Sequence, residues 1–192
     1  MAKYHIDSIQ VWGNFHHEGK EYCLAHLSAH EVSFFDKKKT EHRFIVTYGL
    51  HCFTKDETEF NIPVIISDGR HEQYVCLERY ECSKYLPMLL KKIDEPRIKL
   101  YQTAHEKFFF IHGFHPATNE EVPYKICVAF FKENRKLRIH VTSAFIAREG
   151  EGSPGKPVQS NKGVSLFKII TDLVRAPKKK RAGPKETRNR HV

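Results

Sequence analysis

No apolar run in the sequence approaches the ~20 residues that a membrane-spanning helix needs. The first residues, MAKYHIDSIQ, also lack the apolar segment of a secretion signal. Together these absences predict a cytoplasmic protein that does not insert into a membrane. Cysteine is scarce, and the five cysteines lie mostly in apolar, strand-like segments. Their odd number and apolar setting favour buried, reduced thiols over a disulfide framework.

The motifs of common catalytic and metal sites are also missing. The sequence has no glycine-rich phosphate loop and no Gly-x-Ser-x-Gly turn around a nucleophilic serine. Nucleotide hydrolysis through such a loop and acyl transfer through such a serine therefore gain no support. The thirteen histidines and five cysteines never fall into a Cys-x-x-Cys or His-Glu-x-x-His spacing. We predict no metal and no cofactor, with a structural zinc site as a minor alternative.

Positive charge is concentrated at one end of the sequence. The net charge is +9, whereas residues 175–192 hold eight basic residues and one acidic residue, which gives +7. The rest of the chain therefore carries only 9 − 7 = +2. A chain of 192 residues is long enough for one domain with a hydrophobic core. We expect a single domain over residues 1–174, followed by a disordered basic tail over residues 175–192.

The strongest strand signal lies between residues 124 and 146. Apolar residues there recur at every second position on both sides of a polar four-residue break, which predicts a β-hairpin near the centre of a sheet. Alternation along its second strand places Arg138, His140 and Thr142 on one face. Ser143 falls in phase with the apolar residues, so it is predicted on the opposite face.

The remaining pattern favours an α+β fold with a mainly antiparallel β-sheet, one or two short helices and the disordered basic C-terminal tail. Gly49 lies inside a long strand and predicts a bulge or a close backbone approach. Helices are predicted over residues 83–93, with Ser83 as the N-cap, and over residues 164–174. Residues 147–163 are rich in glycine and proline and predict a mobile loop. The other predicted strands are 3–12, 22–27, 31–35, 43–54, 61–67, 73–77, 98–101 and 107–114.

His51 is the first candidate site residue. It comes at the end of the long strand, just before a polar loop. An imidazole with an ordinary pKa near ~6.5 can accept or donate a proton at neutral pH. The alternative is a half-buried strand histidine with no chemical role, one among the thirteen.

Ser143 and Arg138 form the second candidate. A hydroxyl near the end of a central strand can bind a phosphate oxygen, and a guanidinium can neutralise the phosphate charge. The alternative is structural: Ser143 relieves crowding at a core position while Arg138 faces the solvent.

The third candidate is the basic cluster Lys178, Lys179, Lys180 and Arg181 in the tail. Such a cluster attracts phosphates in a salt-dependent way that does not depend on base sequence. A terminal segment that only keeps the protein soluble has the same composition. The sequence leaves both interpretations open.

The motifs His51-Cys52-Phe53-Thr54 and Ser143-Ala144-Phe145 carry a resemblance. With several antiparallel strands and a small helix, they resemble the metal-independent endoribonuclease superfamily that includes barnase, colicin nucleases and RelE-type toxins. Similar pairs of motifs occur in uncharacterised bacterial and mobile-element proteins. The resemblance covers residues 43–146 and consists of short motifs.

This resemblance implies cleavage of RNA by its own 2′-hydroxyl. His51 would be the acid or base, Arg138 would stabilise the charge of the phosphorane, and Thr54 and Ser143 would contact the phosphate. The sequence departs from the family at Phe145, where many such enzymes have a tyrosine whose hydroxyl can donate a proton. The early catalytic helix of the family is also missing.

Three functional hypotheses follow. The first is a metal-independent endoribonuclease of the toxin or phage-defence type. The alternative is a non-catalytic β-rich domain, encoded by a phage or plasmid, that binds a host protein or nucleic acid. The third is a subunit whose exposed strands pair with a protein partner or with a second copy in a homo-oligomer. RNA or another nucleic acid is the expected partner in the first hypothesis.

Overall fold

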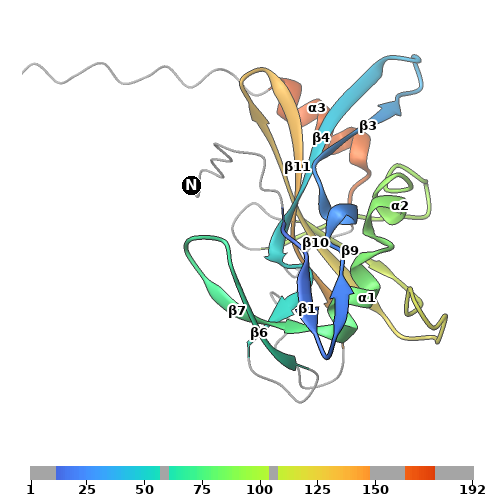
Figure 1. Cartoon of the computed structure of the whole chain (residues 1–192). Helices are drawn as coiled ribbons and strands as arrows, with labels where there is room; N and C mark the ends of the chain where they lie inside the picture. The colour runs from blue at the N-terminus through green and yellow to red at the C-terminus, as the bar shows by residue number, and fades with distance from the viewer. Residues whose placement is uncertain (1–11, 57–60, 104–107, 148–162, 176–192) are drawn as a thin grey trace, which may run out of the picture.

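The structure is a computed structural model, and it describes residues 12–56, 61–103, 108–147 and 163–175 (Figure 1). Over these residues the chain forms three β-sheets, of six, three and two strands, and three short α-helices. This confirms the α+β class with a mainly antiparallel sheet. The strand predicted at residues 3–12, the loop at 147–163 and the tail at 175–192 lie almost entirely outside the described residues.

The six-stranded sheet is the centre of the fold. All of its neighbouring strands are antiparallel except β4 and β11, which run parallel. Its strands, in spatial order, are β3 (His30–Phe35), β4 (Glu41–His51), β11 (Lys136–Ile146), β10 (Tyr124–Glu133), β9 (Phe108–His112) and β8 (Tyr101–Gln102).

The predicted central hairpin is confirmed as strands β10 and β11, the two middle strands of this sheet. Its turn is formed by Asn134 and Arg135, whose φ angles are 46° and 67°. Two successive positive φ angles twist a two-residue turn in the sense that antiparallel strands require. The polar break in the sequence therefore encodes the reversal of the chain.

Two smaller sheets flank the central one. β6 (Asn61–Ser67) lies at the edge of the three-stranded sheet, beside β7 (Glu72–Cys76) and then β5 (Thr54–Lys55). The edge position agrees with Pro63, which cannot donate a backbone hydrogen bond to a neighbouring strand. The remaining pair is β1 (Phe15–His17) and β2 (Lys20–Tyr22).

The strand predicted at residues 22–27 is wrong. After β2 the chain turns into a 3₁₀ helix, η1 (Ala25–Leu27), because the backbone N–H of Leu27 bonds the carbonyl of Leu24 at 2.9 Å. Both leucines are 1% exposed, so a tight turn places them in the core as effectively as a strand would.

The helix predicted over residues 83–93 is present only in part, and an additional helix precedes it. Ser83 is the last residue of α1 (Leu77–Ser83), and its hydroxyl donates to the carbonyl of Tyr80 at 2.7 Å instead of capping a following helix. A second helix, α2 (Leu86–Leu90), follows after a short break. The closing helix predicted over 164–174 is confirmed as α3 (Leu166–Arg175).

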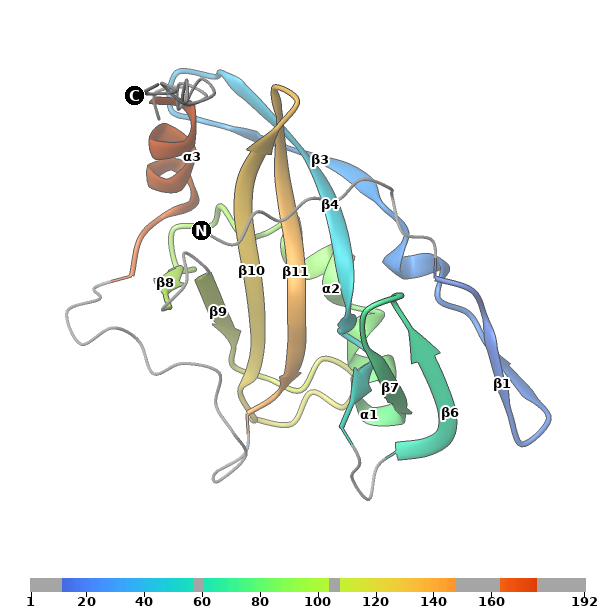
Figure 2. The ribbon, with the colours of Figure 1, turned by 90° about the vertical axis from the view of Figure 1, so that its left-hand side faces the viewer.

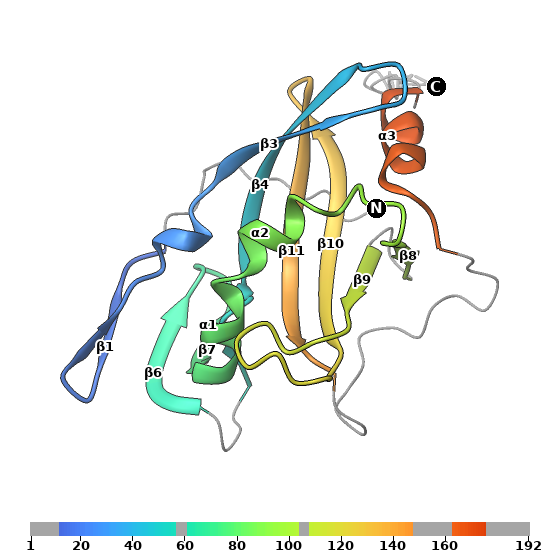
Figure 3. The ribbon, with the colours of Figure 1, turned by 90° about the vertical axis from the view of Figure 1, so that its right-hand side faces the viewer.

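Helices α1 and α2 cover one face of the six-stranded sheet (Figure 3). No helix of the described residues covers the opposite face, which is turned toward the viewer in Figure 2. That face carries a small apolar cluster of its own, built from Phe109, Cys127 and Phe145. The larger core lies between the sheet and the helices.

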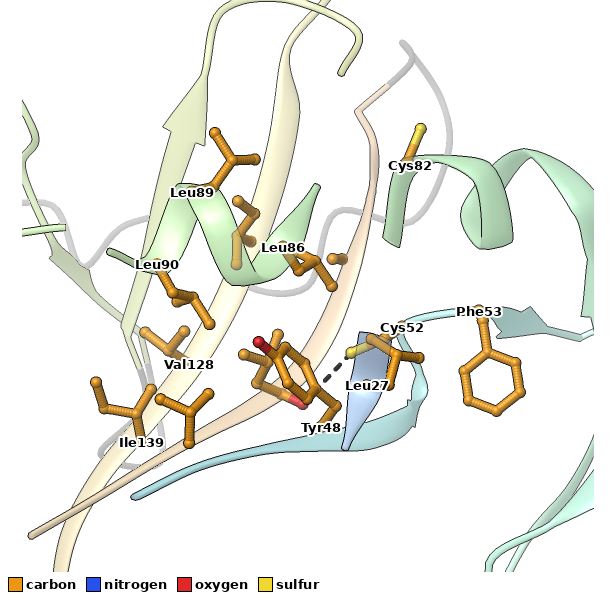
Figure 4. Close-up of a cluster of buried hydrophobic side chains, with 14 of the residues drawn as sticks. Leu27, Tyr48, Cys52, Phe53, Cys82, Leu86, Leu89, Leu90, Val128 and Ile139 are labelled. Carbon is orange, nitrogen blue, oxygen red and sulfur yellow. Dashed lines mark hydrogen bonds between the residues drawn. The ribbon is translucent and has the colours of Figure 1, made fainter. Parts of the chain in front are cut away.

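In this core, leucines of α2 pack against strand residues such as Val128, Ile139 and Tyr48 (Figure 4). The Cys52 thiol donates to the carbonyl of Val141 at 3.5 Å. Burial raises the pKa of Cys52 to about 12, since a thiolate is costly to place away from water.

Among the described residues, no helix is long and apolar enough to cross a membrane.

Burial predicts how the cysteines react. All five are free thiols, and Cys23 is exposed whereas Cys52, Cys76, Cys82 and Cys127 are buried. We expect iodoacetamide near neutral pH to modify Cys23 rapidly and the other four only after unfolding, because the thiolate is the reactive species. Mass spectrometry with and without denaturant measures this. Rapid labelling of Cys52 in the native protein would contradict the described core.

Candidate functional site

Two of the predicted site residues lie side by side. Ser143 of β11 is the register partner of His51 at the end of β4. The register shifts between Val141 and Ser143, so one extra residue is inserted here and the alternation of faces is reset. Ser143 therefore shares the helix-free face of the sheet with His140. The prediction that it shares a face with Ile139 and Val141 is wrong, because a bulge is not visible in a strict two-residue alternation.

Gly49 lies beside this bulge, as its place inside the strand predicts. A Cβ atom at this position would lie 3.3 Å from the carbonyl oxygens of Val141 and Thr142 and from Nε2 of His140. Glycine thus permits a close approach of β4 to β11. The other ring nitrogen of His140, Nδ1, lies 2.9 Å from the hydroxyl of Thr47.

Thr54 is not available to contact a phosphate. Its side chain is fully buried, and its hydroxyl lies 2.8 Å from both the carbonyl of Leu50 and Oε1 of Gln73. Both partners belong to the junction between β4 and the three-stranded sheet. Thr54 therefore connects these elements.

Arg138 is far from His51. It is the register partner of Ile45, five residues before Ser143 on β11. At about 3.3 Å per residue this separates Arg138 from the His51 position by about 16 Å along the strand. Its Nη2 pairs with Oε2 of Glu133 at 3.0 Å, and both side chains are nearly buried. The expected convergence of the imidazole and the guanidinium does not occur.

A second histidine does approach His51. The ring centres of His51 and His71 are 6.4 Å apart. His71 belongs to the β6–β7 turn, where Oδ1 of Asp68 accepts the backbone N–H groups of Arg70 and His71 at 2.9 and 2.8 Å. The turn at Asp68-Gly69 is visible in the sequence, but the contact between two distant histidines is not.

Asp68 remains ionised beside these imidazoles. Partial burial acts to raise the pKa of its carboxyl group, but the backbone N–H groups of His71 and Arg70 and the nearby rings of His71 and His51 outweigh burial and lower this pKa.

No three His, Cys, Asp or Glu side chains in the described part of the chain are arranged to hold a metal ion.

Arg79 of α1 stabilises the end of β4. Its Nη1 donates to the carbonyls of His51 and Thr54 at 3.1 and 2.7 Å. Its guanidinium carbon also lies 5.3 Å from the ring centre of Phe145 on β11. Arg79 therefore fixes the end of β4, and sequence reasoning gave no signal for it.

A separate feature lies at the opposite end of the sheet. Because β4 and β11 are parallel, the β3–β4 and β10–β11 turns that precede them lie at the same end, and α3 ends there too (Figures 2 and 3). We call residues 36–40, 132–136 and 171–175 the basic end. Seven basic and three acidic residues give it a charge of 7 − 3 = +4. The basic residues are all exposed and are Lys37, Lys38, Lys39, Lys132, Arg135, Lys136 and Arg175.

The acidic residues of the basic end have local partners. Glu133 pairs with Arg138, and Asp172 lies 2.8 Å from Nζ of Lys168. Asp36 accepts the backbone N–H groups of Lys38 and Thr40 in its own turn. The predicted cluster from Lys178 to Arg181 lies outside the described residues, but it follows Arg175 closely in the sequence.

Comparisons with known proteins identify a family for this chain, but the names of the matches state no activity. The model of the YjaZ family matches residues 14–174. Protein YjaZ of Escherichia coli (strain K12) is 27% identical over 177 residues, which cover 87% of this chain and 93% of that protein. No solved structure gives a significant match.

The position of Arg79 predicts a large effect on stability. Replacement by methionine removes two charged hydrogen bonds to backbone carbonyls, so the free energy of unfolding should fall by about 2 kcal/mol or more. Urea unfolding followed by circular dichroism measures the loss. Arg97→Met is the control, because that side chain is 77% exposed and pairs with the neighbouring Glu95. Equal effects of the two changes would rule out a supporting role for Arg79.

Proposed function

Since the chain belongs to the YjaZ family, whose name states no activity, we propose from its geometry that it is a non-catalytic domain that binds RNA through its basic end. The observation that carries this proposal is the convergence of three cationic segments, distant in sequence, at one end of the sheet. The chain before the tail carries a net charge of only +2, so the composition alone does not reveal this patch.

The charge pattern suits a phosphate backbone. Lysine and arginine side chains that neutralise phosphates release bound counterions, which favours association without reading the base sequence. The cations of the basic end come from two turns and a helix end, so no single helix or strand presents them. Single-stranded RNA fits such a surface because its unpaired bases and backbone can adapt to it.

The tail supplies further basic residues that can bind phosphates. Lys178, Lys179, Lys180 and Arg181 begin three residues after the last described residue, Arg175, which belongs to the basic end. A basic segment attached there adds phosphate contacts to a strand that is already bound. The tail and the basic end therefore act on the same ligand.

Thr54 is buried and Arg138 pairs with Glu133, which favours binding over the catalytic scheme implied by the ribonuclease resemblance. We propose a cytoplasmic location, because free thiols persist in that reducing compartment and RNA is found there. Binding to a host protein and homo-oligomer formation remain predictions of the sequence.

The lysines of the β3–β4 turn test RNA binding. We expect the combined change of Lys37, Lys38 and Lys39 to glutamine to weaken binding of a single-stranded RNA about tenfold or more. The slope of log affinity against log salt should fall by about 2, since each phosphate contact in a single strand contributes about 0.7. Fluorescence anisotropy at several salt concentrations measures both quantities.

A matched variant controls for net charge. Lys91, Lys92 and Lys99 are also exposed, and changing them to glutamine removes the same charge away from the basic end. We expect less than a threefold effect in this variant. If both triple variants lose affinity equally, a local interface is excluded. If the full chain binds a protein from the host but no RNA, the proposal is wrong.

Metal-independent RNA cleavage is the second candidate function. The observation that favours it is the 6.4 Å separation of the His51 and His71 ring centres, beside the hydroxyl-bearing end of β11. Two imidazoles at such a distance can serve as base and acid for attack by a 2′-hydroxyl and departure of the 5′-oxygen. His71 would then supply the second group in place of Arg138.

Cleavage of total RNA in the presence of EDTA tests this candidate. If it is correct, the purified protein produces 2′,3′-cyclic phosphate ends, and His51→Ala and His71→Ala each lower the rate about 100-fold or more. His16→Ala, which changes an exposed histidine of β1, should leave the rate unchanged. Intact RNA after long incubation with the unaltered protein would eliminate the candidate.

A further inference from the structure

A groove of about 320 Å³ borders the basic end, between the β3–β4 turn and α3. Its apolar surface comes from α3 and comprises Phe167, Ile170 and Val174. Lys38 lines it from the turn and Arg175 from the end of the helix. The groove therefore combines an apolar surface with a cation from each of its two sides.

The apolar part of the groove is exposed mainly at Val174. Val174 is 54% exposed, which is high for a valine on a helix whose Leu166, Ile169 and Ile170 are buried. Phe167 is half-buried beside it. Exposed apolar surface rimmed by polar residues is typical of a binding site.

An imidazole borders the same groove in a fixed position. The ring of His42 lies 6.3 Å from that of Phe167 at an interplanar angle of 60°, and its Nε2 lies 3.2 Å from Oδ2 of Asp36. The backbone N–H of Thr40 is the main cause that lowers the pKa of Asp36, so this carboxylate stays ionised at neutral pH. Asp36 holds His42 and the turn in place.

We propose that this groove holds one unpaired nucleotide of the bound RNA, with the base against Phe167 and Val174 and the phosphates near Lys38 and Arg175. The inference rests on the proposed function, because it names what the basic end binds beyond phosphate charge. Aromatic and apolar side chains stack on bases of any sequence, and nearby cations bind the backbone. A volume of about 320 Å³ lies at the lower limit of sites for small ligands and admits one nucleotide but no duplex.

Nuclear magnetic resonance titrations of the full chain with adenosine 5′-monophosphate, adenosine and inorganic phosphate test the site. We expect the monophosphate to shift the backbone amide signals of residues 36–42 and 167–175. Inorganic phosphate alone should bind at least tenfold more weakly, because it lacks the base. Shifts from the monophosphate that fall elsewhere on the protein would overturn the inference.

Two variants separate the base contact from the charge. Val174→Glu should weaken binding of the monophosphate at least tenfold, whereas Ile65→Glu should not, although Ile65 on β6 is also 54% exposed. Phe167→Leu keeps the apolar volume but removes the aromatic ring. It should weaken adenosine and the monophosphate alike and leave binding of inorganic phosphate unchanged. Circular dichroism confirms that each variant is folded.

Failure of this inference can be told apart from failure of the proposed function. If RNA binding depends on Lys37, Lys38 and Lys39 but Val174→Glu leaves monophosphate binding unchanged, the groove is not a nucleotide site and RNA binding stands. If the monophosphate binds in the groove while RNA of any length does not bind, the nucleotide site stands and the proposed function fails. Occupation of the groove by an apolar peptide in place of the monophosphate would overturn the inference.

Discussion

The parallel pairing of β4 with β11 is the constraint on which the rest of the structure depends. It joins two antiparallel hairpins, β3–β4 and β10–β11, into one six-stranded sheet. Parallel strands that each follow a tight turn place both turns at one end and both strand ends at the other. The basic end and the region around His51 therefore lie at opposite ends of the same two strands.

The close contact between these strands depends on a glycine and a bulge. Gly49 lets the backbone of β4 approach β11 where any side chain would crowd two carbonyl oxygens. The bulge then resets which residues face the helix-free side, and it brings Ser143 beside His51. Arg79 fixes the end of β4 through the carbonyls of His51 and Thr54. Local backbone geometry, more than any charged pair, determines which polar groups meet here.

The two ends of the sheet differ in chemistry. At the His51 end, Thr54 and Asp68 are engaged in hydrogen bonds with backbone groups. At the basic end, Lys38 and Arg175 line a groove with an apolar wall. Exposed cations attract phosphates and an aromatic ring can stack on a base, which is why we propose the basic end as the RNA-binding surface.

The sequence by itself determined the central hairpin, the long strand with Gly49, the edge strand with Pro63 and the closing helix, because alternation, turn residues and helical spacing are local properties. It misplaced Ser143 and Ser83, since a bulge and a helix boundary depend on hydrogen bonds that spacing does not reveal. Only the tertiary structure decided that Arg138 lies far from His51, that His71 approaches it and that three cationic segments converge. These outcomes follow from which strands pair and in which direction. Residues far apart in the sequence show no local pattern that reveals this pairing.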